Sequence, residues 1–457
     1  MGAAAGGLLR GLAGGVRRCA LALGLLAPAA ALAWSNHALI SGPALRALPE
    51  FAALPAVPVE PLEAFLVAQG ARLEQVLEQE ESWARAHVHA YAARPDALRY
   101  RVAGAADAAE LRRRFVAAVR IAPDARLALF VQRGAIGEPD SGRTPLATRE
   151  VTTLPHDSTL AATPFVALRA GEPVRPLEIV TSASDEPDYG LDIGLWSDNG
   201  TPQGRAYGFG PQPFGNPALA FGTQAPFHMG FFHESRIVYL AAGFLERTYP
   251  EYRIHLWKTL AEHALRSGHG YWGWRFAGWA MHYLQDLTQP YHARVLPGVG
   301  TVRMLWINTL HLAGWPRLRD EAVTLVSNRH LAFENFQRTV LWAARRDPAP
   351  AAALFEALGD AAADPQYDDD SARGGAARRS AAAADALDAT LAATLPARYV
   401  SDPGFEFGAA EQGIDLEAQL ARGNPAGRAA LVRALAPRLA DAGAYSRALL
   451  RSVLAAR

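Results

Sequence analysis

The sequence predicts a mostly α-helical protein, and three observations support this prediction. Apolar residues recur at three- and four-residue steps from Leu62 to Ala92, the spacing of one helix face. A helical pattern resumes near Phe231 and dominates as far as Arg346. The Ala-rich stretch after residue 375 consists of strong helix formers. With 457 residues, half of them apolar, the chain is long enough for a large core and one or two domains.

The first element is a leader. Three arginines (Arg10, Arg17 and Arg18) precede an apolar stretch from Cys19 to Ala33, which ends in Ala31-Leu32-Ala33. A charged start, an apolar middle and a small-x-small end are typical of a signal peptide. The apolar stretch is shorter than the ~20 residues that span a bilayer as a helix. We therefore expect residues 1–33 to be removed and the chain to be exported, periplasmic or secreted, beginning at Trp34.

Composition excludes several functions for residues 34–457. Without the three arginines of the leader, 42 basic residues face 45 acidic ones, a net charge of −3. This balance gives no electrostatic basis for binding duplex nucleic acid or an anionic membrane surface. The one cysteine, Cys19, lies in the leader, so the processed chain has no disulfide and no thiolate ligand. A bound zinc ion would need nitrogen and oxygen donors.

Residues 60–180 are predicted to form an accessory insertion. Helices are expected at Leu62–Ala92 and Ala106–Val119, and a short strand at Arg126–Gln132. From Gly134 to Leu177 the chain is rich in Thr, Pro and Gly and poorly periodic. The sequence does not specify how this region folds.

Three later segments interrupt the helical pattern. The Gly- and aromatic-rich stretch from Gly200 to Gly222 is predicted to be a long loop. Residues 293–329 are predicted to be an apolar insertion; its apolar run, Val299 to Trp315, is too short to cross a bilayer but could contact a lipid surface. Residues 364–375 are predicted to be a solvated linker before a C-terminal helical segment.

The strongest chemical signal runs from His282 to His292. His282 and Asp286 are four residues apart, so both side chains lie on one face of a helix. Pro290 disfavours helix in the residue before it, which allows the chain to bend and bring His292 back. Imidazole and carboxylate donors suit zinc. The same pattern also fits a helix with one buried histidine and an ordinary terminal proline.

Three weaker elements accompany this motif. His330 and Glu334 again have i,i+4 spacing, although such pairs commonly lie on a solvated helix face. The expected new amine of Trp34 could chelate a metal together with its own carbonyl, with His37 close by. An acidic cluster, 184–192, precedes His228 and is typical of surface turns when it stands alone; His233 is an alternative to His228.

Taken together, the order and types of these residues resemble the zinc-dependent phospholipase C family, whose superfamily includes the fungal single-strand-specific nucleases. The resemblance covers about a quarter of the chain. It rests on the Trp34 start, on Asn36-His37-Ala38-Leu39-Ile40, on the His282–His292 segment and on His330-Leu331-Ala332-Phe333-Glu334-Asn335-Phe336. It implies a single mostly α catalytic domain over 34–457, with a metal cluster in a cleft between helices and loop-rich insertions.

The resemblance also implies a site for three zinc ions. One ion would be held by an acidic residue of the cluster, Asp188 or Asp185, with His228, His282 and Asp286. A second would be held by Trp34 and His37, with Asp286 as a bridge. The third would be held by His292, His330 and Glu334. Asp188 is narrowly favoured over Asp185 as the ligand.

The implied reaction is the hydrolysis of a phosphate ester, in which Asp185 or Asp188 orients the attacking water. Phospholipid is the first expected substrate class, with peripheral contact to a membrane and no transmembrane span. Two alternatives remain open. One is a single-strand-specific nuclease or nucleotidase with the same metals, and the other is a non-catalytic secreted zinc-binding helical protein.

Overall fold

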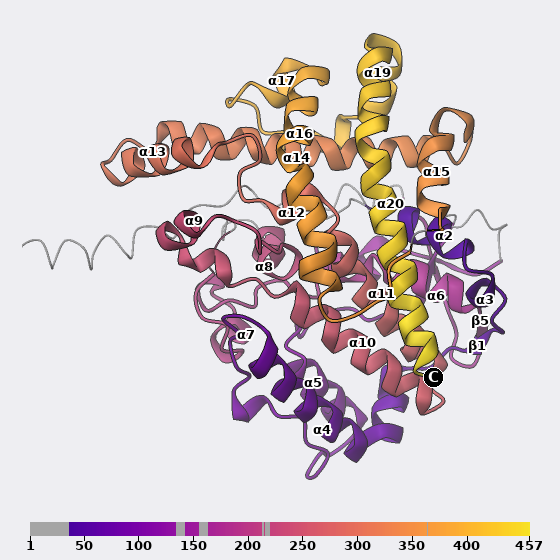
Figure 1. Cartoon of the computed structure of the whole chain (residues 1–457). Coiled ribbons are helices and arrows are strands. Elements are labelled where there is room, and N and C mark those ends of the chain that lie inside the picture. Colours follow the sequence, from indigo (N-terminus) through magenta and orange to yellow (C-terminus); the bar gives the residue numbers. More distant parts are fainter. Residues whose placement is uncertain (1–35, 134–141, 155–162, 213, 215–219, 363) are drawn as a thin grey trace, which may run out of the picture.

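The computed structural model describes residues 36–133, 142–154, 163–212, 214, 220–362 and 364–457 (Figure 1). Residues 1–33, the expected leader, and Trp34, the expected amine ligand, lie outside the described residues.

The prediction of a mostly α-helical fold is confirmed, since helices connected by loops dominate the described part of the chain. The helices of eight or more residues are α2 (Ala38–Arg46), α4 (Leu62–His87), α5 (Ala108–Ala118), α6 (Pro176–Ala183), α10 (Pro250–Arg266), α11 (Gly270–Asp286), α13 (Thr301–Leu312), α14 (Arg317–Ala343), α15 (Ala352–Gly359), α16 (Arg378–Thr394), α19 (Leu416–Gly423) and α20 (Pro425–Ala455).

Shorter elements connect these helices. The short α-helices are α3 (Pro49–Ala52), α7 (Pro202–Ala206), α8 (Ala225–His228), α9 (Arg236–Ala241), α12 (Pro290–Ala293), α17 (Ala397–Val400) and α18 (Phe407–Ala410). The 3₁₀ turns are η1 (Asp96–Leu98), η2 (Thr148–Glu150), η4 (Glu186–Tyr189), η5 (Ser197–Asn199), η6 (Ala220–Gln224), η7 (Gly243–Glu246), η8 (Ala349–Ala351) and η10 (Glu411–Gly413), and η9 (Ser371–Ala377) is a π-helical turn.

Helix α11 lies at the centre of the molecule, between α10, α6 and α20 (Figure 1). Every residue of it from Tyr271 to Asp286 is buried. A helix that is apolar on all sides is expected to be enclosed by other elements. Trp272, Trp274 and Trp279 belong to this core. The described residues form two large hydrophobic clusters, one around α4, α5, α10 and α11, the other around α14, α15, α16, α19 and α20, and a small third one that includes Phe130 and Phe165.

The accessory insertion folds as two helices and small antiparallel ladders. Helix α4 packs against α5 and α10, and it ends at His87 rather than at Ala92 because Val88 is extended. The strands are β1 (Val57–Pro58), β2 (Phe130–Gln132), β3 (Pro145–Leu146), β4 (Phe165–Ala167) and β5 (Pro173–Val174), which pair as β1–β5 and as β2–β4–β3. The predicted strand at Arg126–Gln132 is confirmed over its last three residues.

The other predicted interruptions have more structure than expected. The Gly200–Gly222 stretch contains α7, and Tyr207, Phe209 and Phe214 anchor it in the core. Most of the 293–329 insertion forms α13 and the first part of α14. In the 364–375 stretch, Asp364 is buried against Arg447 of α20, and the π-helical turn η9 leads directly into α16. Among the described residues, no helix combines the length and hydropathy needed to cross a membrane.

Candidate metal centre

The candidate site is built around the C-terminal turns of α11. His282 and Asp286 share one face there, with His282 Nε2 3.3 Å from Asp286 Oδ2. Gly278, one turn earlier, lets α6 approach closely, because a Cβ atom there would lie 2.6 Å from Ala183 Cβ. The close approach allows His282 Nδ1 to donate a hydrogen bond to the carbonyl of Ser184 at 2.7 Å. That bond leaves Nε2 as the free donor atom for a ligand.

The four acidic residues of the predicted cluster have four different environments. Asp185 accepts hydrogen bonds from the backbone amides of His37 and Ala38 and from the Gln132 amide. Glu186 accepts hydrogen bonds from the guanidinium of Arg275 and the indole of Trp279. Asp192 accepts hydrogen bonds from Arg253 and Tyr283. Asp188 lies within 4 Å of three site histidines, His37, His228 and His282.

Asp188 is also the part of the site that reaches solvent. Its side chain is 10% exposed, whereas those of His37, His282 and Asp286 are fully buried. The Gln224 amide donates a hydrogen bond to Asp188 Oδ1 at 3.1 Å and fixes its orientation.

His228, the last residue of α8, lies among three carboxylates. Its Nδ1 atom is 2.9 Å from Asp286 Oδ2 and 3.7 Å from Asp188 Oδ1. Its Nε2 atom is 3.3 Å from Asp192 Oδ2, which is itself paired with the buried Arg253. Asp192 thus orients the ring so that Nδ1 points into the site. His233, the alternative considered above, instead contacts the carbonyl of Arg373.

His37 enters the same cluster from the start of α2. Its Nδ1 atom donates to the Gln285 side chain at 2.8 Å, and its Nε2 atom lies 3.2 Å from Asp286 Oδ1 and 3.9 Å from Asp188 Oδ2. Asp286 therefore presents one oxygen to His37 and the other to His228 and His282. A carboxylate in this position can bridge two metal ions.

A third group lies where α12 meets α14. His330 and Glu334 share one face of α14, with His330 Nε2 2.7 Å from Glu334 Oε1. His292 of α12 places Nε2 3.6 Å from the same oxygen and donates Nδ1–H to the carbonyl of His228. The Gln289 amide holds Glu334 Oε1 at 2.9 Å. The His292–His228 bond connects this group to the other two.

The donor atoms fit divalent ions. In the described residues, three groups bring their ligand atoms within 4.8 Å of one another: His37, Asp188 and His282; His228, His282 and Asp286; and His292, His330 and Glu334. Two donors on one tetrahedral zinc at ~2.1 Å would lie about 3.4 Å apart. His282 Nε2 and His228 Nδ1 are 3.0 Å apart, close to that value.

Several of these buried atoms also lack a hydrogen-bond partner in the structure, namely His37 Nε2, Asp286 Oδ1, His292 Nε2, His330 Nε2 and Glu334 Oε2. Buried polar atoms are normally paired, since leaving one unpaired costs about 1–3 kcal/mol. Five such atoms lie in two neighbouring groups and point toward shared positions. His37 Nε2 lies 3.2 Å from Asp286 Oδ1 and His330 Nε2 lies 2.7 Å from Glu334 Oε1. Either a bound metal ion or protons shared between the imidazoles and carboxylates would satisfy these atoms.

Burial sets the protonation of the site. It raises the pKa of Asp188 and of Glu334 to about 8. Burial would lower the pKa of His37, but Asp286 and Asp188 outweigh it and raise the value to about 9. Burial would also lower the pKa of His228, but Asp192 and Asp286 outweigh it and raise the value to about 10. The buried carboxylates therefore need nearby positive charge, either from protons or from cations.

Sequence reasoning missed the residues that orient these ligands. Gln285 and Gln289 lie inside the His282–His292 motif but were not singled out, and Gln224 and Asp192 lie outside it. An amide side chain has no characteristic spacing, so nothing in the pattern marked Gln285 or Gln224. Asp192 was noted within the acidic cluster, and its pairing with His228 required the fold.

The remaining histidines lie elsewhere. His255 stacks on Trp83 and pairs with Glu80, and His269 pairs with Glu60. His156 lies outside the described residues.

Comparison with protein-family models, with curated proteins and with solved structures found no significant match.

Proposed function

We propose that the chain is an exported zinc-dependent phosphoric ester hydrolase whose first substrate class is phospholipid. The observation that carries this proposal is the convergence of buried, unpaired imidazole and carboxylate atoms from α2, α11, α12 and α14. Segments that lie far apart in the chain supply these atoms. The resemblance to zinc-dependent phospholipases C supplies the reaction.

The donor chemistry supports zinc as the metal. The groups combine neutral imidazole nitrogens with carboxylate oxygens and offer no thiolate, a set that binds zinc well and calcium or magnesium poorly. We assign three ions, as the resemblance implies. The ligands are Asp188, His228, His282 and Asp286 for the first ion, the Trp34 amine and carbonyl, His37 and Asp286 for the second, and His292, His330 and Glu334 for the third.

We prefer Asp188 to Asp185 as the acidic ligand. Asp188 Oδ1 lies 3.8 Å from His282 Nε2, whereas both oxygens of Asp185 already accept hydrogen bonds. Asp185 instead fixes the first turn of α2, and therefore positions His37. Its proposed role is structural support, and the role of orienting water passes to Asp188.

The chemistry follows from this arrangement. Clustered divalent ions polarise a phosphoryl oxygen and make hydroxide available near neutral pH. Asp188, partly exposed and held by Gln224, is placed to orient a water molecule that enters from solvent. Asp192 and Gln285 fix the rings of His228 and His37, and this rigidity preserves the geometry of the site during turnover.

Two observations favour phospholipid over single-stranded nucleic acid. The net charge of −3 for residues 34–457 gives no general attraction for a polyanion. The chain also presents an exposed apolar hairpin beside α9, described below. A nuclease would instead need a basic groove with aromatic platforms for bases.

A direct assay tests the proposal. The purified protein is incubated with phosphatidylcholine and, separately, with single-stranded DNA, each with and without a chelator. We expect a phosphorylated head group to be released from the lipid, and chelator and Asp286→Asn to abolish this release. Turnover of DNA alone would establish the nuclease alternative. No turnover of either substrate by zinc-loaded protein would leave a non-catalytic zinc-binding protein.

A further inference from the structure

Helix α13 and the start of α14 form a hairpin that stands out from the body of the molecule (Figure 1). Large hydrophobic side chains are strongly exposed on it, although most such residues in the described chain are buried. We call the following residues the apolar tip: Val302, Trp306, Leu312, Trp315 and Leu318. Trp306 is 58% exposed and Trp315 is 70% exposed. Exposed patches of this kind mark interaction sites.

The sequence specifies this tip as an ordered turn. Gly314 adopts the left-handed conformation at φ 92°. The Trp315 amide donates to the carbonyl of Leu310, and the Gly314 amide to that of His311, which together make the Schellman ending of a helix. Met304 and Ile307 on the opposite face of α13 are buried. The tip is therefore held in place while its apolar side chains remain in solvent.

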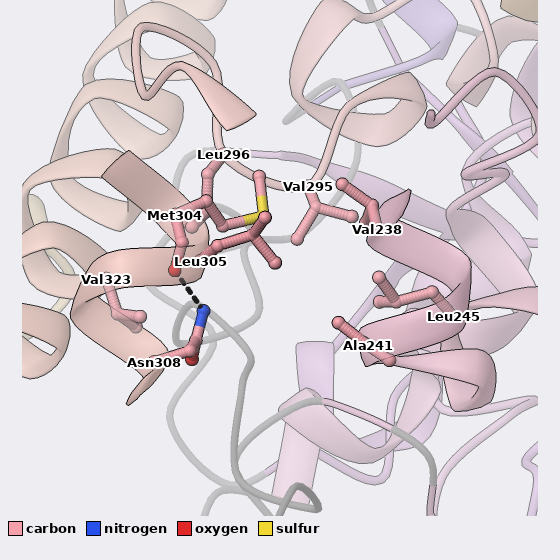
Figure 2. Close-up of a pocket in the computed structure, with 10 residues that line it drawn as sticks. Val238, Ala241, Leu245, Val295, Leu296, Met304, Leu305, Asn308 and Val323 are labelled. Atoms are coloured by element: carbon pink, nitrogen blue, oxygen red, sulfur yellow. Dashed lines mark hydrogen bonds between the residues drawn. The ribbon is translucent and has the colours of Figure 1, made fainter. Parts of the chain in front are cut away.

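The pocket beneath the hairpin does not provide a binding site for a ligand that would cover the apolar tip. Helices α9, α13 and α14 enclose an apolar pocket lined by Val238, Leu245, Met304 and Val323, among others (Figure 2). Its volume is about 30 Å³, room for a single water molecule. An acyl chain or a peptide side chain does not fit into it. A partner therefore has to cover the outer side of the hairpin.

The charge around the tip narrows the choice of partner. From residue 287 to residue 319 the chain holds four arginines and no acidic residue, and Asp320 and Glu321 follow directly. Arg319 pairs with Asp320 and Arg317 with Glu321, whereas Arg303 takes part in neither ion pair. Two of the arginines, Arg303 and Arg317, lie on the exposed part of the hairpin. Arginine side chains suit phosphate groups, and tryptophan prefers the boundary between head groups and acyl chains.

We propose that the apolar tip inserts into the surface of a phospholipid bilayer. A protruding hairpin can enter a bilayer surface without a matching cavity, because lipids rearrange around the inserted side chains. Trp306 and Trp315 would lie at the interface, with the exposed Arg303 among the phosphates. Helix α14 continues from Leu318 to His330 over about 18 Å, so docking would hold the candidate metal centre about that far along α14 from the apolar tip. The expected role of docking, to give the site access to lipid substrate, rests on the proposed function. Docking itself requires no hydrolysis.

The test measures binding of metal-free protein to vesicles of phosphatidylcholine and phosphatidylglycerol by co-sedimentation. Chelator is present, so hydrolysis cannot alter the vesicles. We expect the wild type to bind, and Trp306→Ser with Trp315→Ser to bind at least about tenfold more weakly, since each exposed indole carries more than 1.4 kcal/mol of transferable apolar surface. Val67→Ser removes an equally exposed residue from α4 and should bind like the wild type.

Three results would overturn the inference. They are no vesicle binding by the wild type, equal binding by the double variant, and concentration-dependent dimerisation that the double variant abolishes. A second assay measures hydrolysis of a short-chain phospholipid below its critical micelle concentration. It tests the proposed function without any membrane to dock on. The double variant should hydrolyse dissolved lipid normally. Absence of hydrolysis by the wild type would refute the proposed function and leave the vesicle result valid.

Discussion

At the scale of single residues, four neighbouring acids are used in four ways. Asp185 anchors α2, Glu186 pairs with Arg275, Asp188 faces the site, and Asp192 orients His228. All four are buried. Since their shared burial does not distinguish them, their hydrogen-bond partners decide their roles.

This division predicts opposite effects for two conservative substitutions. Asp188→Asn should weaken metal binding at least about tenfold and leave the metal-free fold nearly as stable. Glu186→Gln should lower the free energy of unfolding by about 3 kcal/mol, because it breaks a buried ion pair, and should keep the metal. Zinc titration and urea unfolding of both variants measure these effects. Equal metal affinities in the two variants would contradict the assignment of Asp188.

Protonation provides a second prediction at this scale. His37 and His228 have pKa values raised to about 9 and about 10, so at pH 7 they carry protons in the metal-free protein. Ligation requires the neutral ring, and zinc binding should therefore release at least one proton. Zinc affinity should rise as pH increases from 6 to about 9. Calorimetry in buffers of different ionisation heat measures the release; zinc binding without any proton release would contradict it.

The sequence predicted some of these residues well and others poorly. The i,i+4 pairs His282–Asp286 and His330–Glu334 could be predicted because helical spacing alone places both side chains on one face. The choice of His228 over His233, and of Asp188 over its neighbours, could not be made from spacing. Those choices depend on how α8 and η4 pack on α11, a contact between segments distant in the chain.

At the scale of elements, the contact between α11 and α6 holds His282 against Ser184. Gly278 makes this contact possible. Gly278→Ala should force the helices apart, lower the free energy of unfolding by about 1–3 kcal/mol and weaken zinc binding. Gly359→Ala in α15, where a Cβ atom would meet nothing within 4 Å, serves as the control. If the Gly278 variant matched this control in both properties, close packing at this contact would not support the site.

Prediction of elements from sequence was best where periodicity was long. Helices α4 and α5 and strand β2 begin or end near their predicted limits. The turn at 371–377 was harder to anticipate because Gly374 and Gly375 favour a linker, whereas the turn continues into α16. Asp364 also appeared solvated in the sequence, and its partner Arg447 lies on the distant α20.

At the scale of the whole molecule, the candidate metal ligands lie on helices from both large hydrophobic clusters. Asp286 and His282 lie on α11 of the first cluster, and His330 and Glu334 lie on α14 of the second. Ions bound to these groups should therefore stabilise the packing of the two clusters. Each ion at a concentration 100 times its Kd contributes about 2.7 kcal/mol.

This coupling predicts a thermal effect. Chelation should lower Tm by several degrees, and added zinc should restore it. Asp286→Asn removes the proposed bridge and should show a much smaller zinc-dependent change. Scanning calorimetry of both proteins, with and without zinc, measures the difference. An identical Tm for chelated and zinc-loaded wild type would mean that the ions do not stabilise the fold.

The most direct test of the metal centre is anomalous diffraction at the zinc absorption edge from crystals of the processed protein. The account predicts anomalous peaks between His228, His282 and Asp286, beside His37, and between His292, His330 and Glu334. Peaks elsewhere, or zinc-replete crystals in which these imidazoles contact the carboxylates directly, would contradict it.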